Sequence, residues 1–324
     1  MPVDPHDPHD PHDPHDPHDP HDLRCPLCAT PLAPGERALT CAQGHSFDRA
    51  RQGYINLLRP TRLRGDIPAM LHARRRFLDA DWYAPLAEAV AAAVSAWLAE
   101  DGAAIPPEAR ALLDAGCGEG YYLRRLAATQ APTFLANGWR LYGLDLAKDA
   151  IRMAAGRAAV LAAALAPTPT VTWLVASSKD RLPFADAGVG ALLTIFAPRH
   201  AEEFARVVAP GGLLLVVTPT GDHLAQARAA IPWLLTPDAA KDERLRATLD
   251  ADFALMEART VSFTLALDAT ALADLVEMTP HRPVEAPALA ATTRAVAALA
   301  PGGRLTVGAA CIVRRYRRRR SARD

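Results

Sequence analysis

The stretch from Leu112 to Tyr122, LLDAGCGEGYY, contains the residues best suited to chemistry on a small ligand. An apolar run ends at Asp114, and three glycines follow at alternate positions, Gly116, Gly118 and Gly120, before a segment with helical spacing. This order predicts a strand, a tight turn and a helix. Glycines let the backbone bend sharply and let a ligand lie against it, and the following helix offers unpaired N–H groups there.

The acidic residues around this turn indicate a cationic ligand. Asp114 and Glu119 would repel the pyrophosphate of a dinucleotide placed at the helix N-terminus. S-adenosylmethionine instead carries an ammonium and a sulfonium group, which carboxylates favour. One strand later, the segment LYGLDL reaches Asp145, where a carboxylate can accept two hydrogen bonds from a ribose diol. The pattern therefore predicts an S-adenosylmethionine site rather than an ATP or NAD site.

A second group of residues has the spacing of a zinc site. Cys25 and Cys28 form a CxxC pair, and Cys41 and His45 form a CxxxH pair after twelve intervening residues. Two such pairs supply the tetrahedral ligand set that Zn²⁺ prefers. Because four protein ligands fill that set, the predicted site is structural rather than catalytic. The alternative is a loop that contains reduced cysteines and an unrelated histidine.

Basic residues gather on both sides of the glycine turn, although the net charge of the chain is zero. Residues 23–76 hold ten arginines against three acids, and residues 314–324 hold seven arginines. In the first segment the arginines alternate with Phe47 and Tyr54. Cations contact phosphates and aromatic faces stack on unpaired bases, so the pattern favours single-stranded or looped RNA as a partner. A charged face that only contacts solvent is the alternative.

Regular alternation of strand and helix patterns predicts that these residues lie on a doubly wound, Rossmann-like α/β sheet, whose ligands bind at the carboxyl ends of the strands. Two helices are expected within 69–99, and 130–138 is expected to be a surface insertion. Two later strands are expected to form an antiparallel edge. The predicted strands are 110–115, 139–145, 171–176, 190–196, 212–218, 259–267 and 304–313, and the predicted helices are 120–129, 147–165, 200–208, 222–231 and 269–278.

Composition divides the chain into five predicted parts. The Pro-His-Asp repeat has no apolar residue to bury and should be disordered, although its six histidines also suggest metal storage. No apolar run is long enough to span a membrane and no signal peptide is visible, which predicts a cytoplasmic protein. The parts are a disordered repeat at 1–22, a zinc-ribbon RNA-recognition domain at 23–60, a linker with helices at 61–108, a methyltransferase domain at 109–313 and a disordered basic tail at 314–324.

Several motifs in combination resemble the 23S rRNA (guanine-N1)-methyltransferases of the RlmA type, and most closely the tylosin-resistance branch. They are CPLC, CAQGHSFDRARQGYINLL, LLDAGCGEGYY, GLDLAK, VASSKDRLPF, FAPR and VVTPTGDHL, and they extend from about residue 23 to about residue 313. The resemblance implies a zinc ribbon ahead of a class I S-adenosylmethionine-dependent methyltransferase domain. It also implies methylation of N1 of one guanine in a 23S rRNA hairpin loop, a role in macrolide resistance and two subunits around one hairpin.

The resemblance also implies roles for individual residues. Many methyltransferases have an acid after the third strand to recognise adenine, but Ser177 and Ser178 stand there in this chain and Asp180 follows later. The guanine is expected to turn out of its loop into a pocket beside Phe196–Arg199. The implied zinc ligands are Cys25, Cys28, Cys41 and His45. The predicted cofactor-binding residues are Tyr83, Gly118, Glu119 and His223, which the resemblance implies, together with Gly116, Gly120 and Asp145 from the glycine turn and the next strand.

No residue stands out as the acceptor of the proton on guanine N1; His223 and Asp180 are candidates by location only, and water is the third. Two other functions fit the sequence as well. One is a small-molecule methyltransferase in which the ribbon has no part in recognition. The other is a non-catalytic, zinc-dependent factor that binds ribosomes. The intact glycine turn argues against the second and the basic flanks argue against the first.

Overall fold

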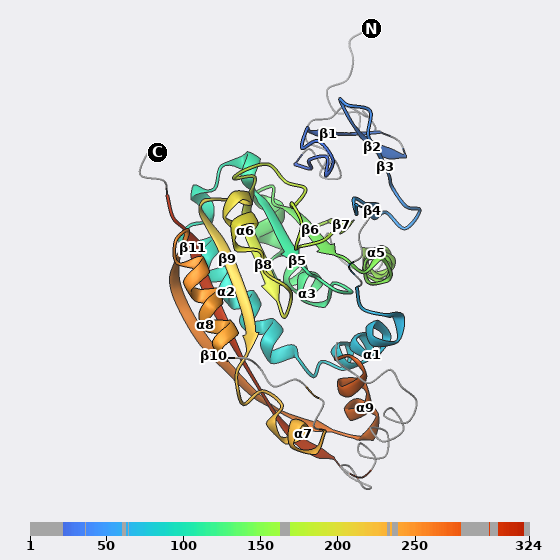
Figure 1. The fold of residues 1–324 in the computed structure, drawn as a ribbon, viewed down its shortest axis with the longest axis vertical. Coiled ribbons are helices and arrows are strands. Elements are labelled where there is room, and N and C mark those ends of the chain that lie inside the picture. Colours follow the sequence, from blue (N-terminus) through green and yellow to red (C-terminus); the bar gives the residue numbers. More distant parts are fainter. Residues whose placement is uncertain are drawn as a thin grey trace.

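The computed structural model of the protein contains two β-sheets and a set of helices around the larger one (Figure 1). It describes residues 22–35, 37–59, 63, 65–162, 169–231, 234, 239–279, 298 and 304–320. The Pro-His-Asp repeat up to residue 21 and the last four residues of the basic tail lie outside this range. Within it, no helix is long and apolar enough to cross a membrane.

The large sheet has eight strands in the order β10-β11-β9-β8-β5-β6-β7-β4. β5 pairs in parallel with both β6 and β8, so the strand order reverses at β5, where ligands of such sheets bind. β11 pairs antiparallel with β9 and β10, which confirms the predicted antiparallel edge. The strands are β4 (Ile55–Asn56), β5 (Ala111–Ala115), β6 (Arg140–Asp145), β7 (Val171–Val175), β8 (Val189–Ile195), β9 (Val208–Pro219), β10 (Phe253–Leu267) and β11 (Leu305–Arg318).

Helices cover both faces of this sheet, because successive residues of each strand point to opposite faces. Leu112 of β5 belongs to a core cluster with residues of α2, α3 and α5, whereas Leu113 belongs to a cluster with residues of α6 and α8. α4 occupies the predicted surface insertion, and α8 was not predicted. The helices are α1 (Pro68–Asp79), α2 (Ala84–Glu100), α3 (Tyr121–Thr129), α4 (Ala131–Ala136), α5 (Lys148–Ala162), α6 (Ala201–Val207), α7 (Ala225–Ala230), α8 (Ala239–Leu249) and α9 (Ala269–Glu277).

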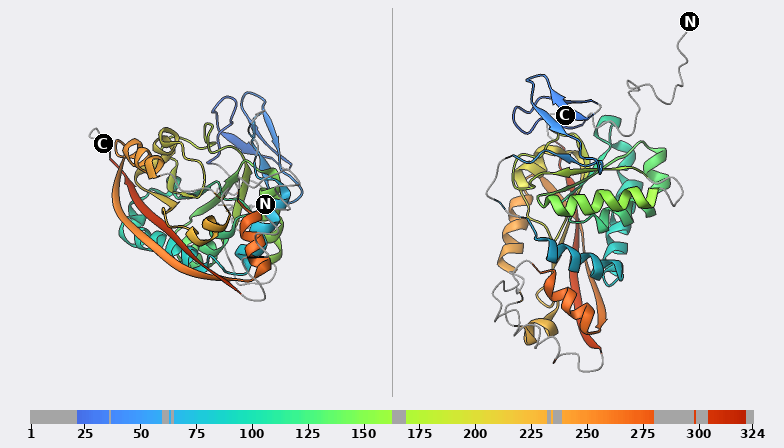
Figure 2. Two further views of the ribbon diagram at one scale, coloured as in Figure 1. Left: turned by 60° about the horizontal axis from the view of Figure 1, so that its bottom comes forward. Right: turned by 90° about the vertical axis from the view of Figure 1, so that its right-hand side faces the viewer.

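The small sheet forms the core of the N-terminal ribbon, which lies at one end of the molecule while α7 and α9 lie at the other (Figure 2). Its antiparallel strands are β1 (Leu32–Pro34), β2 (Ala38–Cys41) and β3 (Ser46–Asp48). β4 of the ribbon segment pairs in parallel with β7 of the large sheet. Leu23 and Leu39 also share a buried cluster with Phe184. The ribbon is therefore part of the same packed body.

Asp22 corrects the predicted limit of the disordered repeat. Its Oδ2 accepts hydrogen bonds from Arg140 Nε at 2.5 Å and from the Tyr142 hydroxyl at 2.8 Å. The arginine side chain is partly buried and Tyr142 is fully buried, so both need a polar partner. The last aspartate of the repeat supplies that partner and attaches the start of the ribbon to β6.

The predicted disorder of residues 314–324 is wrong for its first part, because β11 continues to Arg318. Acids distant in sequence neutralise its arginines: Arg315 pairs with Glu100 at 2.9 Å, and Arg317 pairs with Asp101 at 3.3 Å. Tyr316 points the other way and is buried. Because successive side chains of a strand point to opposite faces, this basic run places the aromatic Tyr316 in the core while Arg315 and Arg317 remain paired on the other face.

Replacing Tyr316 with alanine should lower the free energy of unfolding by roughly 3–5 kcal/mol, the usual cost of truncating a fully buried aromatic side chain. Urea denaturation would measure this change. Arg320→Ala is the matched control, since Arg320 lies two residues beyond β11 and is exposed. It should change stability by no more than about 0.5 kcal/mol. If the two variants were equally stable, the conclusion that β11 continues through Tyr316 would be contradicted.

Candidate functional site

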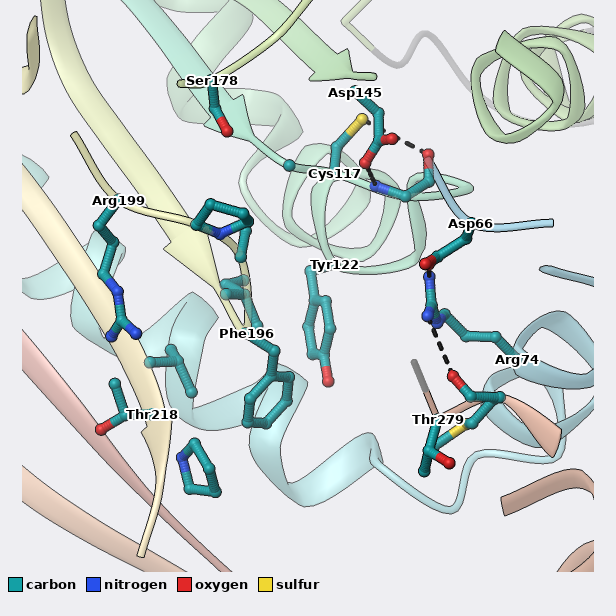
Figure 3. A pocket seen from close by; sticks show the side chains of 18 of the residues that line it. Asp66, Arg74, Cys117, Tyr122, Asp145, Ser178, Phe196, Arg199, Thr218 and Thr279 are labelled. Atoms are coloured by element: carbon teal, nitrogen blue, oxygen red, sulfur yellow. Dashed lines mark hydrogen bonds and ion pairs between the residues drawn. The ribbon is translucent and has the colours of Figure 1, made fainter. Parts of the chain in front are cut away.

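A cavity of about 1200 Å³ opens at the carboxyl ends of β5, β6, β8 and β9 (Figure 3). This is the edge at which doubly wound sheets bind their ligands. The cavity brings together nearly all of the predicted cofactor-binding residues, which come from the turn after β5, the end of β6, the start of α2 and the turn after β9. Those that line it are Tyr83, Gly116, Gly118, Glu119, Asp145 and His223.

The glycine turn has the predicted conformation, but its three glycines serve different ends. All three have positive φ, at 91°, 56° and 81°. A Cβ on Gly116 would lie 2.3 Å from the Cβ of Ala197, so the turn packs tightly against the segment after β8. Gly118 faces the cavity. Gly120 does not line it; a Cβ there would lie 2.4 Å from the Trp173 ring, so this glycine allows packing rather than ligand contact.

Asp145 holds the turn as well as facing the cavity. Its Oδ2 accepts a hydrogen bond from the Gly118 N–H at 2.9 Å, and its Oδ1 accepts one from the Ala147 N–H at 2.8 Å. Each carboxylate oxygen retains a further lone pair, so a ribose diol can still bind there. Burial raises the pKa of Asp145 despite these two donors. Asp145 therefore has a second role besides its predicted contact with a ribose: it fixes the backbone of the glycine turn.

Asp114 is the carboxylate that most needs a cationic partner. It is buried at the end of β5, and its Oδ1 has no hydrogen-bond partner. Burial, and after it the charges of Asp145 and Glu119, raises the pKa of Asp114 to about 8. Burial also raises the pKa of Glu119. A bound cation would satisfy the orphaned oxygen and relieve the repulsion among the three carboxylates, so the site fits the ammonium and sulfonium of S-adenosylmethionine.

Arg74 is a site residue that sequence reasoning missed, because it lies within a run of three arginines that resembled an ordinary charged face. It reaches from α1 over the glycine turn, pairs with Asp66 at 2.7 Å and donates to the Met278 carbonyl at 3.2 Å (Figure 3). Next to it, Arg76 forms an ion pair with Asp274 at 2.5 Å. These contacts fix α1 against α9, and the two helices form one wall of the cavity.

Aromatic groups form the wall opposite Arg74. The Tyr83 hydroxyl lies 3.2 Å from His223 Nε2, and His223 Nδ1 lies 3.1 Å from the Ala310 carbonyl oxygen. Burial lowers the pKa of His223 to about 4, so the imidazole is neutral at pH 7. Phe196 follows the fully buried strand β8, yet its side chain is 43% exposed and its φ is 54°. A non-glycine residue rarely adopts this conformation, and strain of this kind gathers at ligand sites.

Only one of the two residues predicted as candidate proton acceptors lines the cavity. His223 lines the cavity, whereas Asp180 is not among the residues that line it. Ser177 and Ser178, which occupy the place of the expected acid after β7, are buried and do line it. Hydroxyl groups, rather than a carboxylate, therefore line the cavity at this position.

The four predicted zinc ligands meet at one point in the ribbon, their ligand atoms all within 4.8 Å of one another. Cys28 Sγ and Cys41 Sγ are 3.6 Å apart, and Cys41 Sγ and His45 Nδ1 are 3.3 Å apart. Ligands about 2.0–2.3 Å from a tetrahedral Zn²⁺ would be separated by about 3.5–3.8 Å, so the set fits that ion. Burial raises the pKa of Cys41, but hydrogen bonds from the backbone of Gln43 and His45 lower it on balance to about 6.

The raised pKa of Asp114 predicts a pH-dependent stability in the protein without its ligand. The unfolded carboxyl titrates near 3.8 and the folded one near 8, so its stabilising effect is complete below about pH 4 and is lost as pH rises through 8. Asp114→Asn removes this titration. The free energy of unfolding of the wild type should therefore fall relative to the variant by about 1.4 kcal/mol per unit between about pH 5 and 8. Urea denaturation of both proteins across this pH range would measure the difference. If the two free energies of unfolding changed in parallel with pH, the raised pKa assigned to Asp114 would be contradicted.

Comparison with known proteins finds similarity in both parts of the chain. The family profile described as "RlmA, N-terminal" matches residues 23–62, and the one described as "Methyltransferase domain" matches residues 113–216. A 23S rRNA (guanine(748)-N(1))-methyltransferase of Streptomyces fradiae is 40% identical over 80% of this chain and 84% of its own. A protein of Micromonospora griseorubida, provisionally named a 23S rRNA (guanine-N1)-methyltransferase, is 40% identical over 91% of this chain and 97% of its own.

Proposed function

Because the chain belongs to the family of 23S rRNA (guanine-N1)-methyltransferases, we propose that it methylates N1 of a guanine in a single-stranded or hairpin loop of 23S rRNA. The enzyme uses S-adenosylmethionine and carries one structural Zn²⁺. The observation that carries the proposal is a buried carboxylate, Asp114, whose Oδ1 has no hydrogen-bond partner, beside a glycine turn and in one packed body with a Cys3His ribbon. The carboxylate accounts for a cationic methyl donor, and the ribbon accounts for a module that selects RNA.

The donor site follows from the residues that line the cavity. Asp114 and Glu119 would bind the cationic groups of S-adenosylmethionine, and Asp145 its ribose, with Gly118 leaving room for the ligand against the backbone. When bound, S-adenosylmethionine supplies the methyl group. Tyr83 and His223, which contact each other, would close the donor site on the side of α2. Gly116 and Gly120 act through packing, since their absent side chains leave space for Ala197 and Trp173.

The target guanine would enter beside Phe196. A stacked base cannot bring its N1 close to a methyl donor in a protein cavity, so the nucleotide must turn out of its loop. The exposed Phe196 ring provides a flat apolar face next to the glycine turn, and its neighbour Ala197 fixes that position against Gly116. His223 is a weak base with a pKa of about 4 and its Nε2 already faces Tyr83. We therefore assign the proton on N1 to water and a positioning role to His223.

The ribbon would select the RNA. It lies at the end of the sheet near the carboxyl end of β7, and its basic segment includes the exposed Arg51 and Arg59. Arg62 and Arg64, which belong to the same predicted basic segment, lie outside the described residues. Two subunits around one hairpin remain part of the proposal, and the molar mass measured by light scattering with and without the RNA would test it.

Purified protein incubated with radiolabelled S-adenosylmethionine should label the large rRNA from cells that lack the enzyme. A metabolite extract serves as the alternative substrate. Because methylation at N1 blocks base pairing, reverse transcription of the labelled 23S rRNA should stop at one guanine. Label in the metabolite fraction alone would favour a small-molecule methyltransferase. Failure to bind S-adenosylmethionine would favour a non-catalytic ribosome-binding factor.

A further inference from the structure

The cavity is divided by charge. Its carboxylates, Asp66, Asp114, Glu119 and Asp145, gather around the glycine turn, where the donor binds. Arg199 lies on the other side of the cavity, beside Thr218 and away from Asp145 (Figure 3). Two further arginines line the cavity from elements that follow β9, Arg228 on α7 and Arg244 on α8. S-adenosylmethionine has no phosphate, so this basic wall has no evident role in binding the donor.

Arg228 has a buried donor group without an acceptor. Its Nη2 donates to the Gly221 carbonyl at 2.5 Å, but its Nη1 is buried and has no hydrogen-bond partner. Its charge also contributes to the lowered pKa of His223, which places it beside the aromatic wall. An unpaired, buried guanidinium N–H is costly, because the group has lost water without gaining an acceptor. A ligand oxygen at this position would remove that cost.

The three arginines line one cavity, although they belong to separate elements. Arg199 is in the loop between β8 and α6, and α8, which carries Arg244, packs against α6. Guanidinium groups bind phosphate oxygens in a bidentate manner and keep their charge at any physiological pH. Arginines that line one cavity with an exposed aromatic ring, Phe196, suit a nucleotide whose base stacks on the ring and whose backbone contacts the cations.

We infer that Arg199, Arg228 and Arg244 bind the phosphates that flank the target guanosine in the RNA. This inference rests on the proposed function and adds a substrate-binding site to it. When the guanosine turns out of its loop, its two neighbouring phosphates follow it to the mouth of the cavity. The basic wall would hold them there, and the acidic end of the cavity would exclude them from the donor site by repulsion.

Arg228→Gln tests this site, with Arg228→Lys as the variant that keeps the charge. The glutamine variant should raise the KM for a 23S rRNA hairpin about tenfold, the loss expected for one charged hydrogen-bond pair. The slope of log affinity against log salt should fall by about 0.7, the value for one phosphate contact on a single strand. The lysine variant, which keeps the charge, should keep the wild-type slope. The dissociation constant for S-adenosylmethionine, measured by calorimetry, should not change in either variant.

Arg244→Gln should act in the same direction, and Arg246→Gln on the same helix is its matched control. Arg246 pairs with Glu243 at 3.4 Å and does not line the cavity, so its loss should leave the KM and the salt slope near the wild-type values. If Arg228→Gln and Arg244→Gln match this control while the wild type methylates the hairpin, the phosphate site is wrong. If the wild type neither binds nor methylates the hairpin, the proposed function itself fails.

Discussion

Asp145→Ala should weaken the binding of S-adenosylmethionine by at least about a hundredfold, because hydrogen bonds to a charged group contribute roughly 1.5–3 kcal/mol each. The variant loses the acceptor expected for the ribose and also releases the backbone N–H groups of Gly118 and Ala147. The glycine turn then loses one of the contacts that fix it to the end of β6 and keeps the backbone hydrogen bonds to the Leu144 carbonyl. Isothermal titration calorimetry with the donor would measure the change.

Two variants separate these effects. Asp149→Ala removes a partly exposed acid four residues further along the chain, which pairs with Arg152 at 3.0 Å, and it should leave donor affinity unchanged. Asp145→Asn keeps one carbonyl acceptor and should lie between the alanine variant and the wild type. If Asp145→Ala bound the donor as tightly as Asp149→Ala does, the donor site assigned to this edge of the sheet would be wrong.

Cys25→Ser should release the zinc and abolish specific RNA binding. A structural zinc site contributes about 10–16 kcal/mol in small zinc-binding peptides, and a ribbon of this size has little other core. The effect should extend beyond the ribbon, because Leu23 and Leu39 pack in one cluster with Tyr142 of the large sheet and Phe184 of the loop between β7 and β8. We therefore expect a lower melting temperature for the whole protein, with donor binding retained below it.

Gln43→Ala is the control for this variant, since the side chain of Gln43 is exposed within the same ribbon. Metal content by mass spectrometry, melting by calorimetry and binding of a labelled hairpin should all remain at wild-type values. The role of the ribbon would be refuted by a Cys25→Ser protein that has lost zinc but still binds and methylates 23S rRNA normally.

The features that were predictable from sequence are those whose signal is local. The glycine turn, Asp145 at the end of the next strand and the paired metal ligands each occupy a few consecutive residues, and the fold brings their parts together through regular strand and helix repeats. The antiparallel pair of β10 and β11 was predicted as two late strands that flank a helix and close the edge of the sheet. In these cases the residue types needed for structure and for chemistry coincide.

The features that were missed depend on distant partners. Arg315 and Arg317 resembled a disordered basic tail until Glu100 and Asp101 were seen beside them. Gly120 resembled a ligand contact, whereas it serves the ring of Trp173 from β7. No local pattern states which acid or ring will lie opposite a residue after folding, and tertiary contacts decide such cases.

Arg228 and Arg244 were missed for a related reason. Arg228 is the one arginine of α7, and Arg244 lies beside Arg246 in the charged helix α8, so only the lining of the cavity reveals a shared role. A signal was present in the long connection between β9 and β10, since insertions of this length in a doubly wound domain often serve the substrate.

The pairing of β4 with β7 has a practical consequence for shortened forms of the protein. Ile55 and Asn56 cover the backbone groups at the end of β7, and Leu57 donates to the Val175 carbonyl at 2.9 Å. A fragment that begins after residue 57 would leave this row of donors and acceptors open, together with the apolar surface that Leu23 and Ile55 bury. Bare strands of this kind recruit strands from other molecules. We expect such a fragment to self-associate and precipitate, whereas point substitutions of the zinc ligands keep the strand protected.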